Sequence, residues 1–456
     1  MQQTLFSIPA DPFGIPLFGL GVVSALWLVW CVIYAIIFSR KHGWNSELIS
    51  SLGVMALIEF MLIVVVPRIM VPDEDGRLGI AIRGYGVMFL LGIISGVGLS
   101  VYRGRKVGMS PELIYSLALW VFVAGMIGAR SFYVIQKWDS FERETWQATL
   151  SAALNITEGG LVVFGGLIGA LGAIIYFARK HKLPLLPLAD MAVPGMMLGL
   201  AFGRIGCFFN GCCYGDVCNA PWGGVEFPAG SPPHIRQVET GRAFGFMISG
   251  MPDTIELNSN KPRIVPTITT VEPGSPAEKA GLKVGDVITK IDSSRARTSE
   301  DDREQAEGDE DLTVDEARRG LLNQFHPQVL PTRITTNRGA FEVEPLPGLI
   351  EHSRPTHPAQ IYASIDALLA TLLLLAFTPL SRRDGETFAL FLTVHAVSRF
   401  LLEQIRVDEA GMFGTSLSIS QHISIVLLVL GVGLWLFIER RPPGFAWPRV
   451  EAKPAS

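Results

Sequence analysis

The sequence predicts an all-α polytopic membrane protein with about nine transmembrane helices and an inserted α+β domain. Three observations lead to this fold class. Only 18% of the 456 residues are charged, and the mean hydropathy is +0.36. Apolar runs of about 18 residues or more, which are long enough to cross a bilayer as helices, recur along the chain. One long polar stretch, roughly 216–350, interrupts these runs.

Most of the apolar runs precede the polar stretch. The N-terminus lacks the basic region and the small-residue cleavage site of a signal peptide, so we expect no cleaved leader. The transmembrane helices are expected near 16–38, 47–70, 84–102, 113–136, 160–178, 186–206, 361–380, 386–403 and 419–438.

Charge in the loops predicts the orientation of these helices. Lys and Arg near helix ends favour the cytoplasmic side of a membrane. We therefore expect the N-terminus and the polar stretch to lie outside and the C-terminus to lie in the cytoplasm. Basic residues follow every second expected helix, at 39–42, 103–106, 179–182, 382–383 and 440–441, whereas acids occupy the intervening loops at 73–75, 139–140 and 408–409.

The polar stretch contains the pattern of a small α+β domain. Val271–Ser294 predicts a strand, a turn, a short helix at Ala277–Ala280 and a second strand at Val287–Ile291. This segment resembles a PDZ domain of the kind attached to bacterial envelope proteases, with Phe244–Ile248 as its carboxylate-binding loop. Such modules capture peptides by strand addition, and the alternative is a spacer. The acidic block Glu300–Asp311 is expected to be a solvated loop.

Gly203–Gly215, which reads GRIGCFFNGCCYG, is the stretch most suggestive of a binding site. It lies at the expected outer end of the sixth helix. Its glycines let the backbone approach a ligand closely. Arg204 lies at membrane depth and therefore needs an anionic or other polar partner. The stretch predicts an anion-binding site at the outer membrane surface.

A second group of charges lies in and just after the eighth expected helix. Its members are spaced at i, i+4, i+8 and i+11, so they share one helical face. Guanidinium groups match the geometry of phosphate oxygens, so this face predicts a phosphate-binding cavity. Snorkelling to lipid headgroups is the alternative for a single arginine, but it does not explain the set. The group is His395, Arg399, Glu403 and Arg406, and we expect it to converge with Arg204, Arg130 and Tyr85.

These residues resemble the signature of the prolipoprotein diacylglyceryl transferase family. The resemblance divides the chain into two extra N-terminal helices (1–79), a first core part (80–215), the PDZ-like segment (216–350), a second core part (351–440) and a cytoplasmic tail (441–456). The matching motifs are Arg83-Gly84-Tyr85-Gly86, Gly128-Ala129-Arg130, Phe164-Gly165-Gly166-Leu167, Gly203-Arg204-Ile205-Gly206, Asn210-Gly211, Tyr214-Gly215, His357-Pro358-Ala359-Gln360-Ile361-Tyr362 and Arg399-x3-Glu403-x2-Arg406.

The resemblance implies a reaction at the periplasmic face of a bacterial inner membrane. Such enzymes move diacylglyceryl from phosphatidylglycerol to the lipobox cysteine of a prelipoprotein signal peptide, which forms a thioether. We expect no metal, no organic cofactor and no nucleic-acid partner. The implied catalytic residues are Arg204, Arg399, Glu403 and His395, and the implied phosphatidylglycerol-binding residues are Arg204, Tyr85, Arg130, Asn210, Gly215 and Arg406.

The chain departs from the family pattern at three positions. Phe164 stands where the family has the histidine of its HGGL motif, and Cys207 and Cys212 replace an asparagine and an acid of its GNFxNG region. Because phenylalanine cannot move a proton, His395 or His357 is expected to replace the missing base. The alternative is a diverged relative, weakly active or inactive, that acts as a membrane-anchored peptide receptor.

The cysteines form an unusual group. Cys31 is alone in the first expected helix, whereas the other four crowd into 207–218 with the spacing C-x4-C-C-x4-C. This spacing is not a standard zinc pattern. One or two disulfides on the oxidising face are favoured, with buried reduced thiols, a metal ligand or a catalytic thiol as alternatives. The candidates for disulfide formation are Cys207, Cys212, Cys213 and Cys218.

Overall fold

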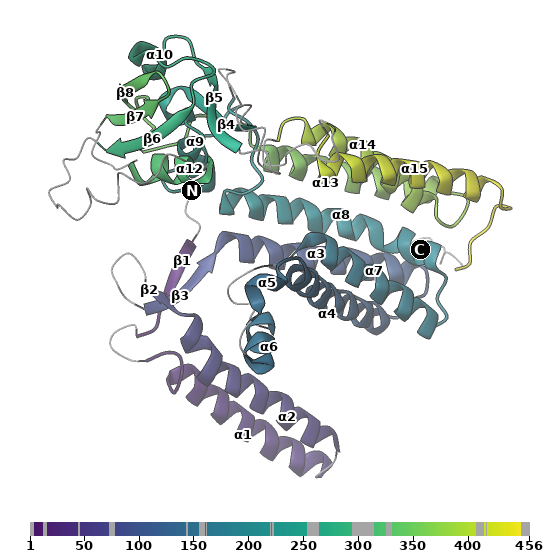
Figure 1. The fold of residues 1–456 in the computed structure, drawn as a ribbon. Coiled ribbons are helices and arrows are strands. Elements are labelled where there is room, and N and C mark those ends of the chain that lie inside the picture. Colours follow the sequence, from purple (N-terminus) through teal and green to yellow (C-terminus); the bar gives the residue numbers. More distant parts are fainter. Residues whose placement is uncertain are drawn as a thin grey trace. The chain divides into compact units, whose positions relative to one another are not determined.

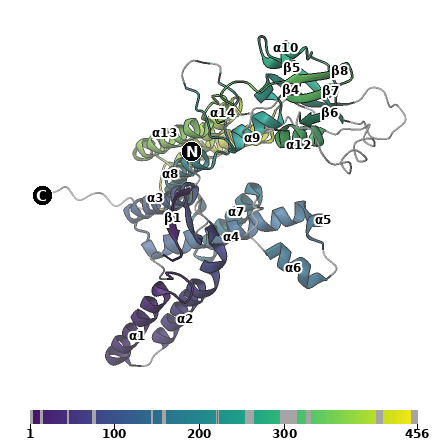
Figure 2. The same cartoon turned by 90° about the vertical axis from the view of Figure 1, so that its left-hand side faces the viewer.

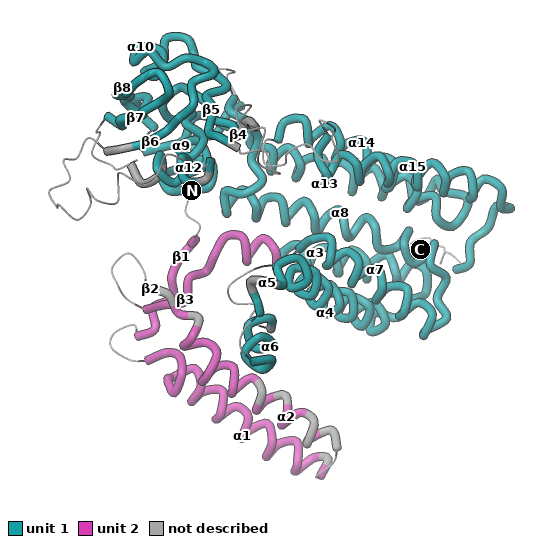
Figure 3. Tube along the Cα trace, in the orientation of Figure 1, with its two compact units in different colours: residues 1, 91–456 teal, residues 2–90 magenta. Residues whose placement is uncertain are grey.

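The structure is a computed structural model (Figure 1). Its chain divides into two units (Figure 3). One unit comprises residues 2–90, and the other comprises residue 1 and residues 91–456. The acidic block at 300–311 and the tail beyond 447 lie outside the described residues. The structure describes residues 4–11, 16–43, 46–72, 78–142, 145–154, 160, 162–218, 220, 223–252, 264–293, 314–324, 331–349, 351–406, 415 and 417–447.

Eight helical stretches within the described residues are long and apolar enough to cross a membrane. This confirms a polytopic membrane protein. The ninth expected span is the helix α14 (Glu386–Glu403), whose 18 residues include the three charged residues Glu386, Arg399 and Glu403, and which packs against α15 and α13. The eight stretches are α1 (Val22–His42), α2 (Ser46–Phe60) with the turns that follow it to Ile69, α3 (Gly84–Lys106), α4 (Pro111–Gln136), α7 (Val163–Lys180), α8 (Leu185–Asn210), α13 (Ala359–Phe377) and α15 (Ile419–Glu439).

The unit of residues 2–90 holds α1 and α2, which the sequence predicted, and a small sheet, which it did not. The strands are β1 (Thr4–Pro9), β2 (Val71–Pro72) and β3 (Leu78–Arg83), in the antiparallel order β1-β3-β2. The indole Nε1 of Trp27 donates to the Met55 carbonyl at 3.3 Å and joins α1 to α2.

Glycines set the distance between neighbouring membrane helices in the other unit. A Cβ on Gly96 of α3 would lie 2.7 Å from the Gly195 carbonyl oxygen of α8. Gly128 of α4 and Gly165 of α7 face each other in the same way, each blocked by the other's carbonyl group. Small residues let helix backbones pack closely in a membrane. Two of the family-like motifs, those around Gly128 and Gly165, therefore carry helix packing.

Helix α8 is the central element because it contacts helices from both halves of the chain. Ala201 and Met197 pack against α13, and the Ser364 hydroxyl of α13 donates to the Ala201 carbonyl at 2.9 Å. At the other end of α8, the Asp190 carboxylate accepts the Phe388 amide at 2.7 Å and thereby caps the start of α14. Asp190 supplies the acceptor that the first amides of a helix lack.

The polar stretch folds into a lobe of short strands and helices (Figures 1 and 2). Its strands form one pair, β4-β5, and one three-stranded sheet, β6-β7-β8, connected by an isolated bridge between Thr267 and Val287. Phe246, Ile268 and Ile334 belong to its buried core. The elements are α9 (Pro232–Glu239), β4 (Phe246–Pro252), β5 (Ile264–Val271), α10 (Pro276–Ala280), β6 (Ile288–Ser293), α12 (Val314–Gln324), β7 (Thr332–Thr336) and β8 (Gly339–Val343).

The strand–helix–strand pattern predicted for Val271–Ser294 is confirmed by β5, α10 and β6. Backbone amides of the predicted carboxylate-binding loop, Phe244–Ile248, already have acceptors within the chain. The amides of Phe244 and Phe246 donate to the Gly241 carbonyl at 2.9 and 3.3 Å, and the Ile248 amide donates to the Thr240 carbonyl at 3.0 Å. These donors are used within the chain, so the structure gives no support to a carboxylate-binding role for this loop.

Asp286 and Arg338 tie the turn before β6 to the turn between β7 and β8. Asp286 is buried and accepts hydrogen bonds from the Arg338 guanidinium and, at 2.8 Å, from the Lys283 amide. The hydrogen bonds from Arg338, followed by that from Lys283, hold the pKa of the Asp286 carboxyl below its usual value. A carboxyl whose pKa falls on folding stabilises the folded state above its unfolded pKa of about 3.9.

We predict that Asp286→Asn destabilises this part of the lobe at neutral pH. The loss should be fully present well above pH 4 and should shrink as the pH falls through the lowered pKa, because Asp286 is then neutral in the wild type as well. Hydrogen exchange of the Lys283–Asp286 segment, compared between the two proteins at each pH, measures the effect. Glu342→Gln, an exposed residue of β8, is the control. Equal protection in wild type and Asp286→Asn at pH 7 would contradict the prediction.

Candidate active site

Three chain segments that lie far apart in the sequence meet in one backbone junction. They are the turn after α8, the segment before α13 and the residues after α14. The Gly215 amide donates to the His357 carbonyl, and the Asp216 amide donates to the Ile405 carbonyl, each at 2.9 Å. Gly215 also forms a β-bridge with Arg406. The ends of α8, α13 and α14 are thereby held together.

Gly215 can only be glycine in this junction. A Cβ there would lie 2.8 Å from the His357 Cβ and 3.0 Å from both the His357 carbonyl oxygen and the Ile405 Cγ2. A side chain at this position therefore fits only if His357 or Ile405 shifts. Gly215 thus packs the junction, and its predicted role in lipid binding stays a prediction.

Two left-handed residues shape the turn after α8. Gly211, with φ of 72°, ends the helix, and Cys213 is in the same conformation with φ of 60°. A non-glycine residue in this region is uncommon and is kept only where the surroundings demand it. Gln360, which is 1% exposed, donates from Nε2 to the Cys212 carbonyl at 2.7 Å and fixes the turn to α13.

A buried carboxylate organises the end of α14. The Glu403 side chain is 2% exposed, and its Oε2 lies 2.6 Å from Arg399 Nη1 and 3.7 Å from Arg406 Nη1. Arg399 also donates from Nη2 to the Ser420 hydroxyl of α15 at 3.1 Å. The predicted stripe of charges is thus present, and Glu403 holds both arginines of this helix end.

Arg204 and His395 belong to the same electrostatic environment. His395 interacts electrostatically with Asp366, Arg399 and Arg204, which come from α13, α14 and α8. In the described part of the chain the half-buried Arg204 guanidinium makes no hydrogen bond and no ion pair. Arg204 is therefore a cation within an apolar helix, and it needs an anion.

Asp366 is a site residue that the sequence reasoning missed. Its carboxylate accepts a hydrogen bond from the Ser398 hydroxyl at 2.9 Å, and it acts electrostatically on His395. The signal for it was present, because Asp366 is the only acid of the apolar helix α13. An acid inside a membrane helix marks a functional site by default.

Arg130 is engaged in a different way from the other predicted arginines. It is 8% exposed, and its guanidinium donates to the carbonyls of Ala153 at 2.7 Å and of Ala152 and Gly160 at 3.1 Å. Ala152 and Ala153 belong to the last turn of α6 (Trp146–Leu154), so Arg130 caps a helix end, where cations are favoured. Its predicted role in lipid binding stays a prediction.

The remaining predicted residues make the following contacts. Tyr85 belongs to the unit of residues 2–90, where its ring stacks on Phe89 at 6.2 Å. Phe164 is half-buried in the first turn of α7. His357 contributes its backbone to the junction, and its ring lies 6.4 Å from that of Tyr362. Asn210 is the last residue of α8, and its side chain hydrogen-bonds Cys212.

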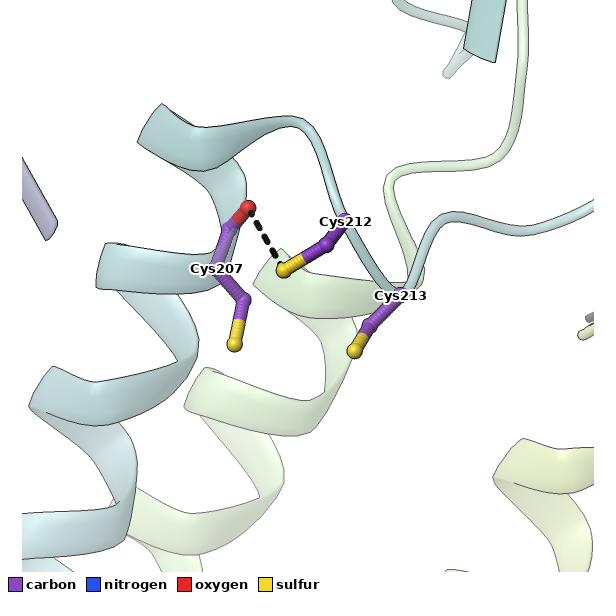
Figure 4. Close-up of side chains that lie close together, drawn as sticks. All are labelled: Cys207, Cys212 and Cys213. Carbon is purple, nitrogen blue, oxygen red and sulfur yellow. Dashed lines mark hydrogen bonds between the residues drawn. The ribbon is translucent and has the colours of Figure 1, made fainter. Parts of the chain in front are cut away.

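Three of the cysteines lie together, and the fourth does not join them. The Sγ atoms of Cys207, Cys212 and Cys213 all lie within 4.8 Å of one another (Figure 4). All five cysteines are described, and each is a thiol in this structure. Cys218 is buried instead against the Ala220 carbonyl at 4.0 Å. The disulfides favoured by the sequence are therefore not formed here.

Cys213 interacts with the charges of the site. The neighbouring Cys207 and Cys212 thiols lower the pKa of the Cys213 thiol, and the guanidinium groups of Arg406 and Arg204 lower it further by stabilising the thiolate. These interactions connect the cysteine cluster to the arginines of α8 and α14.

Comparison with known proteins agrees with this arrangement. A model of the prolipoprotein diacylglyceryl transferase family matches residues 76–437. The chain belongs to this family. The match includes the junction, the arginines and the lobe, and it begins after α1 and α2.

Individual relatives in the family differ in how much of the chain they match. A phosphatidylglycerol–prolipoprotein diacylglyceryl transferase of Rhodopirellula baltica is 34% identical over 97% of this chain and 90% of its own length. One from Gloeobacter violaceus is 37% identical over 34% of this chain and 56% of its own length, and one from Deinococcus radiodurans is 38% identical over 28% and 38%. Only the first of these three matches extends across nearly the whole chain.

We predict that Gly215→Ala destabilises the protein because the added methyl group clashes with His357 and Ile405. Overpacking of this kind costs about 1–3 kcal/mol. Thermal unfolding in detergent should show a lower midpoint than in the wild type. Gly98→Ala is the matched control, since a Cβ at that helical position meets nothing within 4 Å. An unchanged midpoint for Gly215→Ala would show that the junction can relax.

Proposed function

We propose that this protein transfers the diacylglyceryl group of phosphatidylglycerol to the lipobox cysteine of prelipoproteins. Membership of the family supports this proposal. The observation that carries it is the arrangement of arginines at the junction. Arg204 makes no ion pair with the described residues, and it interacts electrostatically with His395 and Cys213. Arg399 and Arg406 are held by one buried carboxylate.

The chemistry requires these charges. The thiolate sulfur of the lipobox cysteine attacks the glycerol carbon that carries the phosphate, and a carbon–sulfur bond forms. The carbon–oxygen bond breaks, and its electron pair leaves with glycerol phosphate. Negative charge grows on the phosphate, and donors fixed in advance stabilise such charge best. Arg204 and Arg399 would hold the phosphate, and Glu403 would keep Arg399 in place.

Because Phe164 cannot accept a proton, another residue must accept the proton of the lipobox thiol. His395 interacts electrostatically with Arg204 and Arg399, and its Nδ1 is buried with no hydrogen-bond partner among the described residues. These two properties of His395 support the prediction that it replaces the missing histidine. Asp366, which interacts with the same ring, would orient it.

We predict that Arg204→Ala lowers thioether formation on a lipobox peptide by about 10²–10³-fold, because one preorganised donor to the phosphate is lost. Arg204→Lys should restore activity only in part, since it keeps the charge and loses the planar fork. Arg40→Ala, in the last turn of α1, is the control for loss of a positive charge. Normal transfer by Arg204→Ala would reject the phosphate site.

Phe164→His separates the two readings of the sequence. If the wild type transfers lipid, the missing histidine has been replaced, as proposed. If Phe164→His is active and the wild type is inert, the chain is a diverged relative, and the receptor alternative stands. The same peptide assay reads both outcomes.

We also propose an orientation, which rests on the charge of the loops. The N-terminus, the junction and the lobe lie on the periplasmic side of the inner membrane, and the C-terminus lies in the cytoplasm. In a cysteine-free background, single cysteines are introduced at Ser39 and, in the lobe, at Lys283. An impermeant thiol reagent added to whole cells should label only the cysteine at position 283. Labelling of position 39 alone would show that the topology is the reverse.

The lobe's identity as a PDZ-like peptide-binding domain stays a proposal. The strands β5 and β6 with the helix α10 between them support it. A peptide that added to the β4 edge would have to replace the Thr240 carbonyl as acceptor for the Ile248 amide. Binding of a labelled peptide that ends in a free carboxylate, and its loss in Ile248→Pro, would test the proposal.

A further inference from the structure

The cysteine cluster is the feature that the proposed phosphate site does not use. Cys207 comes from the last full turn of α8, and Cys212 and Cys213 come from the turn that follows (Figure 4). The left-handed conformation of Cys213, with φ of 60°, brings its side chain back toward the helix end. An unusual backbone conformation is therefore maintained at a position where it gathers three sulfurs.

The spacing of these sulfurs suits a thiophilic cation. They all lie within 4.8 Å of one another. Three thiolates bound tetrahedrally to Zn²⁺, with Zn–S bonds of about 2.3 Å, lie about 3.8 Å apart. Small side-chain rotations would close the difference. The linear spacing predicted no metal site because it contains no paired C-x2-C units, whereas the folded turn groups the sulfurs without them.

The surrounding charges suit the same cation. Three thiolates and one Zn²⁺ carry a net charge of −1, and Arg406 and Arg204 interact electrostatically with Cys213. No further His, Cys, Asp or Glu of the described chain joins the cluster. A site with three protein ligands leaves one position for water or substrate, which is the arrangement of catalytic rather than structural zinc.

We propose that Cys207, Cys212 and Cys213 bind one Zn²⁺ ion, and that its fourth position takes the thiolate of the lipobox cysteine. The second part rests on the proposed function. A thiol that coordinates zinc loses its proton outright, and His395, the acceptor in the proposed function, takes the released proton. The bound thiolate sulfur then forms the bond to the glycerol carbon while the carbon–oxygen bond breaks. The electron pair leaves with glycerol phosphate, and the neutral thioether dissociates.

This inference explains why the chain can carry Phe164 in the position of the family's histidine. A metal that deprotonates the thiol substitutes for part of the work of a base. It also connects the three departures from the family pattern, because Cys207 and Cys212 bind the metal that makes a histidine at position 164 dispensable. Arg204 and Arg406 then act on both the metal-bound sulfurs and the lipid phosphate.

The first test measures metal in the full-length protein, purified in detergent with thiols kept reduced. After exposure to Zn²⁺ and removal of excess, mass spectrometry should find about one zinc per chain. Cys207→Ser, Cys212→Ser and Cys213→Ser should each weaken zinc binding by at least about 10–100-fold, the loss typical of an outer-shell change. Cys31→Ser and Cys218→Ser are matched controls that should retain zinc.

Two outcomes of this test overturn the site. One is a wild-type protein that retains no zinc. The other is zinc that remains undiminished in all three cluster variants, which would place it elsewhere. Since a variant can fail to fold, Co²⁺ substitution of the wild type gives a second readout. Thiolate-to-cobalt charge-transfer absorption should appear, and its absence counts against three sulfur ligands.

The second test asks whether the lipobox thiol binds the metal, and it needs no turnover. A lipobox peptide added to the Co²⁺ protein without lipid should change the absorption spectrum, whereas the same peptide with serine for cysteine should not. An unchanged spectrum overturns the role in thiol activation.

Activity then separates the two proposals. Undiminished transfer after complete removal of zinc overturns the metal inference and leaves the proposed function intact. A cobalt spectrum that responds to the peptide, with no transfer in any metal state, supports the metal site and rejects the transferase function.

Discussion

The site depends on the ion pairs that the buried carboxylate of Glu403 forms with two arginines. With its side chain 2% exposed, it holds Arg399 one turn before it and Arg406 just after the helix end. Loss of one partner of a buried ion pair costs about 3–5 kcal/mol, because the other charge is left without compensation. Arg406 also bridges to Gly215 through its backbone. The positions of both arginine side chains therefore depend on one acid, next to the backbone junction.

The junction brings together helices that the lobe separates in the sequence. Residues 215–216 pair with both His357 and the residues after α14, so the chain leaves the membrane core and returns to it at one place. This geometry lets a lobe of more than a hundred residues be inserted without moving α8 away from α13. The ion pair between Arg354 and Glu272, at 2.5 Å, further ties the returning segment to β5's end.

Function and packing share the same motifs in this fold. Gly215 and Gly165 are positions where no side chain fits, whereas the space beside Gly203 is open next to Arg204. Arg130 satisfies carbonyls at the end of α6, whereas Arg204 has no comparable partner within the described chain. A motif alone does not distinguish these roles, because each depends on which atoms other helices place around the residue.

The sequence by itself determined the membrane helices, the charged face of α14 and the strand–helix–strand pattern of the lobe. These follow from hydropathy, helical periodicity and turn residues, which are properties of neighbouring residues. Only the tertiary structure decided the engagement of Arg130, the closeness of Asp366 to His395, the β1-β3-β2 sheet and the grouping of three sulfurs. Each of these depends on contacts between distant segments or on a left-handed turn at Cys213, and no local pattern in the chain specifies them.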